Sequence, residues 1–142
     1  MANWLPRTQV PGQWLSVSAT TTPLLPGASA LLDLAGLGRL GHFLVISTDA
    51  PGWLSFYSSA AAREADGSRP ITRDPEPGSG VLLDLATTAA ALTIAAPPGG
   101  TYFSSDGATS PNSPPLLRVM ARNTGTAQAA IALTVSAVVL AP

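Results

Sequence analysis

The feature that most limits the possible folds of this chain is a series of short apolar runs, most of which are soon followed by proline, glycine or asparagine. The runs cover residues 13–22, 29–35, 39–48, 53–58, 81–86, 90–96, 116–123 and 128–141. Several alternate apolar and polar positions, as half-buried strands do, and turn residues return at short intervals. We therefore expect an all-β chain that forms a single β-sandwich, jelly-roll or immunoglobulin-like, of about eight strands.

Four local patterns add detail. In the last run Ile131, Leu133, Val135, Ala137 and Val139 fall on one face of the expected strand. Residues 81–86 and 90–96 are expected to pair as a hairpin, and residues 96–115, rich in proline and glycine, to form a contact loop or arm without regular structure. Residues 59–66 (SAAAREAD) are the one helix-like piece, which at about two turns is too short to be stable without packing.

An internal repeat links two of the runs. Residues 26–35 read PGASALLDLA and residues 77–86 read PGSGVLLDLA, with seven of ten positions identical. Each copy reads as a strand entered through a Pro-Gly turn, with core leucines and one outward aspartate, Asp33 or Asp84. We expect the two copies to begin similar hairpins in two packed sheets. The aspartates resemble the carboxylate pair of a glycosidase, but aromatic residues are only 6% of the chain, so they are better interpreted as edge residues that discourage aggregation.

The length of 142 residues suits one domain, which we place at residues 13–142 behind an extended N-terminal arm at residues 1–12. Pro6 and Pro11 disfavour helix in the arm. Trp4 and Leu5 lie in a segment too short for a core of its own. We expect these two side chains to pack on the domain or on a neighbouring subunit.

Composition argues against several classes of function. Charged residues are only 11% and the net charge is −1, which predicts no binding to nucleic acid. The first residues lack the pattern of a signal peptide, and no apolar run is long enough for membrane insertion. Cysteine is absent, which excludes disulfides and thiolate metal sites, and no cofactor motif is present.

The charged residues gather between residues 59 and 80. Arginines and carboxylates alternate there, and we expect ion pairs that hold an irregular connector in place. The candidate structural ion-pair residues are Arg63, Asp66, Arg69, Arg73 and Asp74. The acidic residues Glu64, Asp66, Asp74 and Glu76 also suggest a calcium site, but their spacing fits no known calcium loop and the arginines compete for them. We therefore predict no metal site.

Catalysis has little support in the sequence. His42 is the only histidine, and no serine nucleophile motif accompanies it. Large aromatic side chains point instead to contacts between proteins, with a sugar-stacking platform as the weaker alternative. The candidate interface residues are Trp4, Leu5, Trp53, Tyr57, Tyr102 and Phe103.

The order of features over residues 53–142 resembles a recurrent segment of bacteriophage virion proteins, the tail-fibre and tail proteins. A strand ending in FYSSAAA is followed by Arg63 and Asp66, by Arg69-Pro70-Ile71 and Asp74-Pro75, and then by GVLLDLATT. Residues 123–126 (Asn-Thr-Gly-Thr) form a turn before a long final strand, although the aromatic residue usual near the end of that strand is missing here.

The resemblance implies a non-enzymatic structural component of a virion, assembled in the host cytoplasm and most simply placed in the tail, baseplate or fibre. The expected partners are other virion proteins and further copies of the chain, with a trimer favoured. A capsid decoration (cement) protein is the alternative within this class. A carbohydrate-binding module that recognises host-surface glycans is the alternative from another class.

Overall fold

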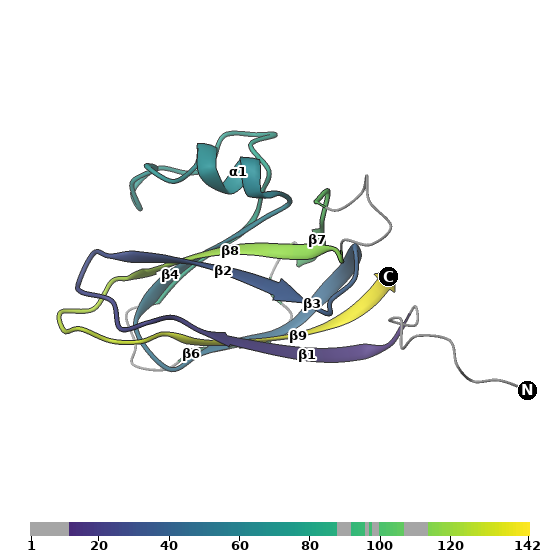
Figure 1. Ribbon diagram of the computed structural model, residues 1–142, viewed down its shortest axis with the longest axis horizontal. Helices are drawn as coiled ribbons and strands as arrows, with labels where there is room; N and C mark the ends of the chain where they lie inside the picture. The colour runs from purple at the N-terminus through teal and green to yellow at the C-terminus, as the bar shows by residue number, and fades with distance from the viewer. Residues whose placement is uncertain (1–11, 88–91, 96, 98–99, 107–113) are drawn as a thin grey trace, which may run out of the picture.

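The computed structural model describes residues 12–87, 92–95, 97, 100–106 and 114–142. Over these residues the chain forms a β-sandwich of two packed antiparallel sheets (Figure 1). Its elements are β1 (Trp14–Thr20), β2 (Ser29–Ala35), β3 (Leu40–Thr48), β4 (Gly52–Tyr57), α1 (Ala60–Ala65), β5 (Val81–Thr87), β6 (Leu92–Ala95), β7 (Thr101–Phe103), β8 (Leu116–Asn123) and β9 (Ala132–Ala141). The prediction of an all-β sandwich is confirmed. Residues 1–11 of the predicted arm, with Trp4 and Leu5, lie outside the described residues.

The pairing of strands corrects three expectations. The larger, five-stranded sheet has the order β1-β9-β3-β6, with β7 also paired to β3, and the smaller sheet has the order β2-β8-β4-β5. The predicted hairpin is wrong, because β5 and β6 belong to different sheets. Strand β7 lies in the segment expected to be without regular structure. The repeated segments do not start hairpins in two sheets, because β2 and β5 are the two edge strands of one sheet.

The core lies between the two sheets and follows the alternation of the sequence. The five predicted inward residues at the end of the chain, from Ile131 to Val139, are all fully buried. On the facing sheet β8 contributes Leu117, Val119 and Ala121. Burial of such side chains is the main force that holds the two layers together.

Strand β4 departs from the alternation, because every one of its six residues is buried. Its inward side chains Leu54 and Phe56 contact the core. Its outward side chains are covered by the connector, which we define as residues 58–80 between β4 and β5 and which includes α1. Figure 1 shows α1 and the connector on one side of the stack, with β1 and β9 on the opposite side.

Helix α1 is one short segment held at its start by side chains. The hydroxyl of Ser59 accepts a hydrogen bond from the Ala62 amide at 3.0 Å, and the carboxylate of Asp106 accepts one from the Ala60 amide at 2.8 Å. These bonds satisfy amides that a helix start leaves unpaired. They fix the helix over the smaller sheet, which places Arg63 against it.

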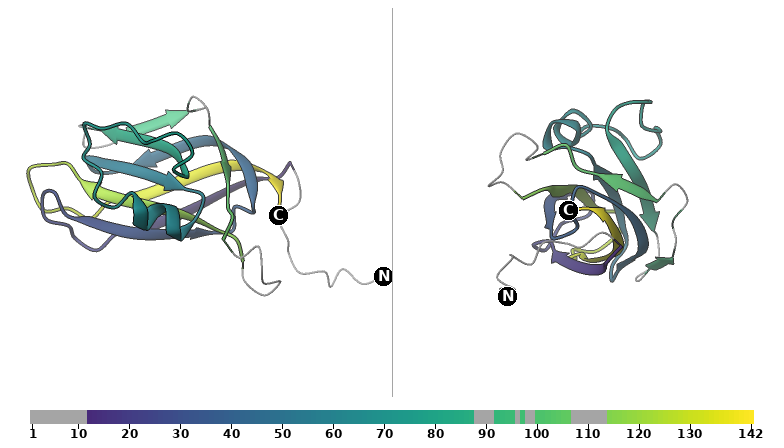
Figure 2. Two further views of the ribbon diagram at one scale, coloured as in Figure 1. Left: turned by 90° about the horizontal axis from the view of Figure 1, so that it is seen from above. Right: turned by 90° about the vertical axis from the view of Figure 1, so that its right-hand side faces the viewer.

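Charge is segregated between the two sheets. The five strands of the larger sheet contain no Asp, Glu, Lys or Arg among their described residues. The smaller sheet carries Asp33, Asp84, Arg118 and Arg122. Figure 2 shows the two layers from two further directions.

Candidate functional site: an arginine–aspartate layer and an uncharged sheet

The connector and the outer face of the smaller sheet enclose a layer of charged side chains, which we call the arginine–aspartate layer. Its members are Asp33, Arg63, Asp66, Arg69, Asp84, Asp106, Arg118 and Arg122. Strand register brings them together, since Asp33 lies opposite Arg118 and Asp84 lies opposite Ser55.

Asp84 is the acceptor on which one half of the layer converges. Its Oδ1 accepts hydrogen bonds from Trp53 Nε1 at 2.7 Å and from Ser55 Oγ at 2.6 Å. Its Oδ2 accepts from Arg69 Nη1 at 2.9 Å. Strand β4 supplies the two neutral donors and the connector supplies the arginine, so Asp84 ties the connector to the sheet.

Asp66, at the end of α1, holds Arg69 from the other side. Arg69 donates to both carboxylate oxygens, from Nε at 2.8 Å and from Nη2 at 3.1 Å. Tyr57 donates its hydroxyl to Asp66 at 2.7 Å. The side chains of Arg69 and Asp66 keep only 7% and 8% of their surface exposed, so this ion pair is well shielded from water.

The pKa values of this cluster shift in the directions that favour the charged pair. Burial alone would raise the pKa of Asp66, but hydrogen bonds from Arg69 and Tyr57 outweigh it and hold that pKa below the ordinary 3.8. Burial and the bond to Asp66 raise the pKa of Tyr57 above its ordinary value. Tyr57 therefore stays protonated and donates, as its geometry requires.

The indole of Trp53 is contacted by two guanidinium groups. The central carbon of Arg122 is 3.9 Å from the ring centroid, and that of Arg69 is 4.9 Å away. Both distances lie within the range of cation–π attraction. This packing leaves Trp53 only 5% exposed and gives Arg122 a partner where hydrogen bonds are few.

Asp33 organises the other half of the layer. It accepts hydrogen bonds from Arg63 at 2.8 Å and from Arg118 at 2.9 Å. Arg118 also donates to Asp106 at 2.6 Å, and Arg63 donates to the backbone carbonyls of Leu32 and Val119. Burial alone would raise the pKa of Asp33, but hydrogen bonds from Arg118 and then Arg63 lower it below 3.8.

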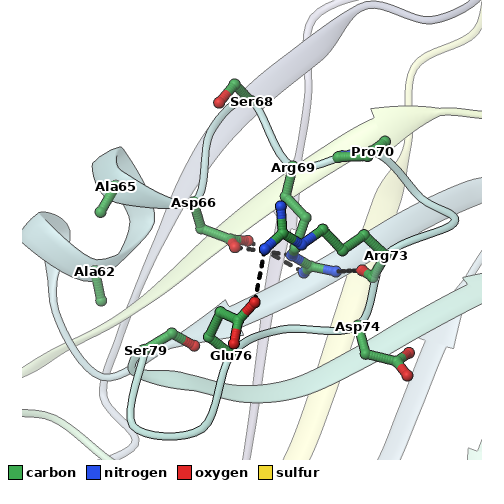
Figure 3. A pocket seen from close by; sticks show the side chains of 10 residues that line it. All are labelled: Ala62, Ala65, Asp66, Ser68, Arg69, Pro70, Arg73, Asp74, Glu76 and Ser79. Carbon is green, nitrogen blue, oxygen red and sulfur yellow. Dashed lines mark hydrogen bonds and ion pairs between the residues drawn. The ribbon is translucent and has the colours of Figure 1, made fainter.

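The outer part of the connector is more open. Arg73 pairs with Glu76 at 2.7 Å, with both side chains well exposed. Next to this pair lies a cavity of about 310 Å³ between α1 and the connector, shown in Figure 3 with its ten lining residues. Asp74 lines the cavity but forms no ion pair with any residue that the structure describes. The arginines that line it already hold carboxylates, so the cavity offers no free cationic group.

The predicted interface residues are placed differently from our expectation. Trp53, Tyr57 and Tyr102 are buried within the chain at 5%, 0% and 0% exposure, so the expectation that they meet a partner is corrected. Tyr102 donates its hydroxyl to the Leu37 carbonyl at 2.6 Å. Phe103 is 47% exposed and is the one described residue of the predicted set that presents its ring to solvent.

The geometry also bears on the chemical alternatives. Asp33 and Asp84 lie on opposite edges of a four-stranded sheet, three strand spacings or roughly 14 Å apart, which is too far for a glycosidase pair. His42 is exposed and contacts Thr101 at 3.0 Å. Among the described residues no group of three or more His, Cys, Asp or Glu is placed to hold a metal ion.

A second surface feature, the outer face of the larger sheet, was not predicted from the sequence. The outer face of the larger sheet has a hydroxyl-rich part, where Ser16 contacts Ser136 at 3.0 Å and Ser18 contacts Thr134 at 2.9 Å. At the end of the sheet where β1 begins and β9 ends, large apolar side chains replace the hydroxyls. We call this set the apolar end; it consists of Trp14, Leu40, Phe103, Val138 and Leu140. The signal was the outward half of the alternating runs at residues 13–22 and 128–141, which lacks charge.

Comparison with known sequences assigns the chain to no family. No protein-family model matches the chain, and no curated protein matches it significantly in sequence. Over its described residues the chain has no helix of the length and apolar character needed to cross a membrane.

Proposed function

We propose that the protein is a non-enzymatic structural component of a bacteriophage virion, located in its tail, baseplate or fibre assembly. The observation that carries the proposal is the outer face of the larger sheet, which has no charged side chain among its described residues. The resemblance of residues 53–142 to phage tail-fibre and tail segments supports the placement in a virion tail.

An uncharged sheet face suits permanent contact between proteins. Burying an ionised side chain at an interface is costly unless it finds a partner, whereas hydroxyls already bonded to one another need none. Exposed apolar side chains gain free energy when a partner covers them. Trp14 and Phe103 are 66% and 47% exposed on this face, and rings of this kind are enriched at protein interfaces.

The arginine–aspartate layer supports a scaffold role in place of catalysis. Each aspartate of the layer accepts at least one hydrogen bond from an arginine. A carboxylate held in this way is a poor general base, since its partners stabilise the charged form. The layer instead fixes the connector, which keeps the sandwich rigid.

The glycan-binding alternative has less support from the rings considered for it. A sugar platform needs exposed rings, and three of the rings considered for it are buried within the chain. A capsid decoration protein would use the same uncharged face. We therefore retain decoration as the second virion placement, to be separated from the first by experiment.

The test is the location of the protein in particles of the virus that encodes it. Particles purified on a density gradient are analysed by mass spectrometry, and an antibody against the chain is followed by immunogold electron microscopy. We expect co-sedimentation with particles and gold on the tail. Label over the whole capsid would indicate decoration, and absence from purified particles would refute a virion role.

We further propose that the chain forms a homo-oligomer, with a trimer favoured. Closed symmetric assemblies are the usual outcome for subunits that bury one face against copies of themselves. Light scattering coupled to size exclusion measures the mass directly. A monomer at high protein concentration would contradict this part of the proposal.

A further inference from the structure

The apolar end is the largest group of exposed hydrophobic side chains that shares one face of the described structure. Trp14 is 66%, Phe103 47%, Leu140 40% and Leu40 37% exposed. Strand register makes them neighbours, because Trp14 lies opposite Val138, and Leu40 lies opposite Phe103. Groups of this kind on a soluble domain mark contact sites.

The N-terminal segment joins the domain beside this group. Val139 accepts a hydrogen bond from the Gly12 amide and donates one to the Gln13 carbonyl at 3.0 Å. Gly12, to which residues 1–11 are joined, therefore lies at the rim of the apolar end, close to the point where β9 finishes. They include Trp4 and Leu5, two large apolar residues that need a surface to cover them.

We infer that the apolar end is the docking surface for residues 1–11 of a second copy of the chain, with Trp4 and Leu5 as its anchors. This inference rests on the proposed structural function and names the partner surface. The match is chemical: apolar anchors meet an apolar surface, and the strands that form this surface carry no charged residue to oppose Arg7, the single ionisable side chain of the segment.

Chain length favours a second copy over the segment's own domain. Residues that precede proline are biased to extended conformations, and the segment contains Leu5-Pro6 and Val10-Pro11. Seven extended residues from Gly12 to Leu5 span roughly 23 Å. The apolar end is three strand spacings wide, or about 14 Å, so the anchors of an extended segment can reach beyond the surface of their own domain.

Disulfide trapping tests this directly, because the chain has no native cysteine. Asn3→Cys places a thiol next to Trp4 without removing an anchor. His42→Cys places one on the sheet face opposite Val138, where the side chain is exposed. The two single variants are purified, one of them with a tag that changes its mass, then mixed and oxidised, and the covalent heterodimer is separated from the two homodimers by mass on a non-reducing gel.

The matched control is Ile71→Cys, also exposed at 52%, on the connector at the opposite side of the sandwich. We expect the Asn3→Cys and His42→Cys mixture to cross-link about tenfold or more faster than the Asn3→Cys and Ile71→Cys mixture, because docking raises the effective concentration. Adding Trp4→Ala and Leu5→Ala to the Asn3→Cys chain should remove the difference.

Two results would overturn the inference. One is equal cross-linking to His42→Cys and Ile71→Cys. The other is a double variant, Asn3→Cys with His42→Cys, that closes within one chain faster than between chains, which would assign the surface to the chain's own segment. Both readouts use purified protein, so their failure is distinguishable from absence of the protein in virions.

Discussion

Asp33 and Asp84 occupy equivalent positions of the repeated segment, on the two edge strands of one sheet, and each is bound by an arginine of the connector. Arg63 reaches Asp33 at 2.8 Å and Arg69 reaches Asp84 at 2.9 Å. The connector is thus fastened at both edges of the sheet that it covers. The expectation that these aspartates discourage aggregation is supplemented by a structural role within the chain.

Replacing Asp84 should destabilise the domain strongly. Asp84→Ala removes the acceptor of Trp53 Nε1, Ser55 Oγ and Arg69, so we expect the free energy of unfolding to fall by about 3 kcal/mol. Asp84→Asn should cost less, because an amide oxygen still accepts from the neutral donors. Urea unfolding measures both. As a control, Asp74→Ala should change stability by less than about 0.5 kcal/mol, and a similar loss there would argue against a specific role for Asp84.

The pair of Tyr57 and Asp66 should act as one energetic unit. Asp66→Ala should lower the free energy of unfolding by about 1–3 kcal/mol, since it leaves Arg69 and the Tyr57 hydroxyl without their acceptor. A double-mutant cycle of Tyr57→Phe with Asp66→Ala should give a coupling energy of at least about 0.5 kcal/mol. The matched cycle of Tyr57→Phe with Glu76→Ala should be additive, and coupling of equal size in both cycles would contradict the proposed bond.

Stability should fall in acid because of Asp33 and Asp66. Their pKa values in the folded chain lie below the ordinary 3.8, so the unfolded chain binds protons first as the pH drops. The stabilisation is present above the ordinary value and is lost as the pH falls through the lowered pKa values. We expect the free energy of unfolding to decrease below about pH 4, and less steeply in the Asp33→Asn, Asp66→Asn double variant. Parallel pH profiles of the two proteins would refute the assignment.

Gly41 should not tolerate a side chain. A Cβ at this position would overlap the hydroxyl of Tyr102 and the backbone oxygen of Val138. We expect Gly41→Ala to cost about 1–3 kcal/mol in thermal or urea unfolding, because a packed core accommodates extra atoms poorly. Gly67→Ala is the comparison, since its Cβ would meet no heavy atom nearer than 3.3 Å. Equal stability of Gly41→Ala and the parent chain would show that β7 moves away at little cost.

The sequence by itself determined the fold class and much of the core. Alternation over the final run identified the inward set from Ile131 to Val139, because each second residue of a strand faces the same side. Turn residues separated the strands, and the concentration of charge identified the connector. These properties are local, so they can be derived without knowing which strands become neighbours.

The tertiary structure alone decided which strands pair and which side chains are buried. Arg63 binds Asp33, thirty positions earlier in the chain, because β2 and β8 pass beneath α1. The sequence predicts that Trp53 and Tyr57 contact a partner, yet the connector of the same chain covers them. Packing of the whole sandwich also decided that β5 and β6 belong to different sheets. Each outcome depends on contacts between residues far apart in the chain, whose formation is decided by packing of the whole sandwich and leaves no periodic signal in the segment itself.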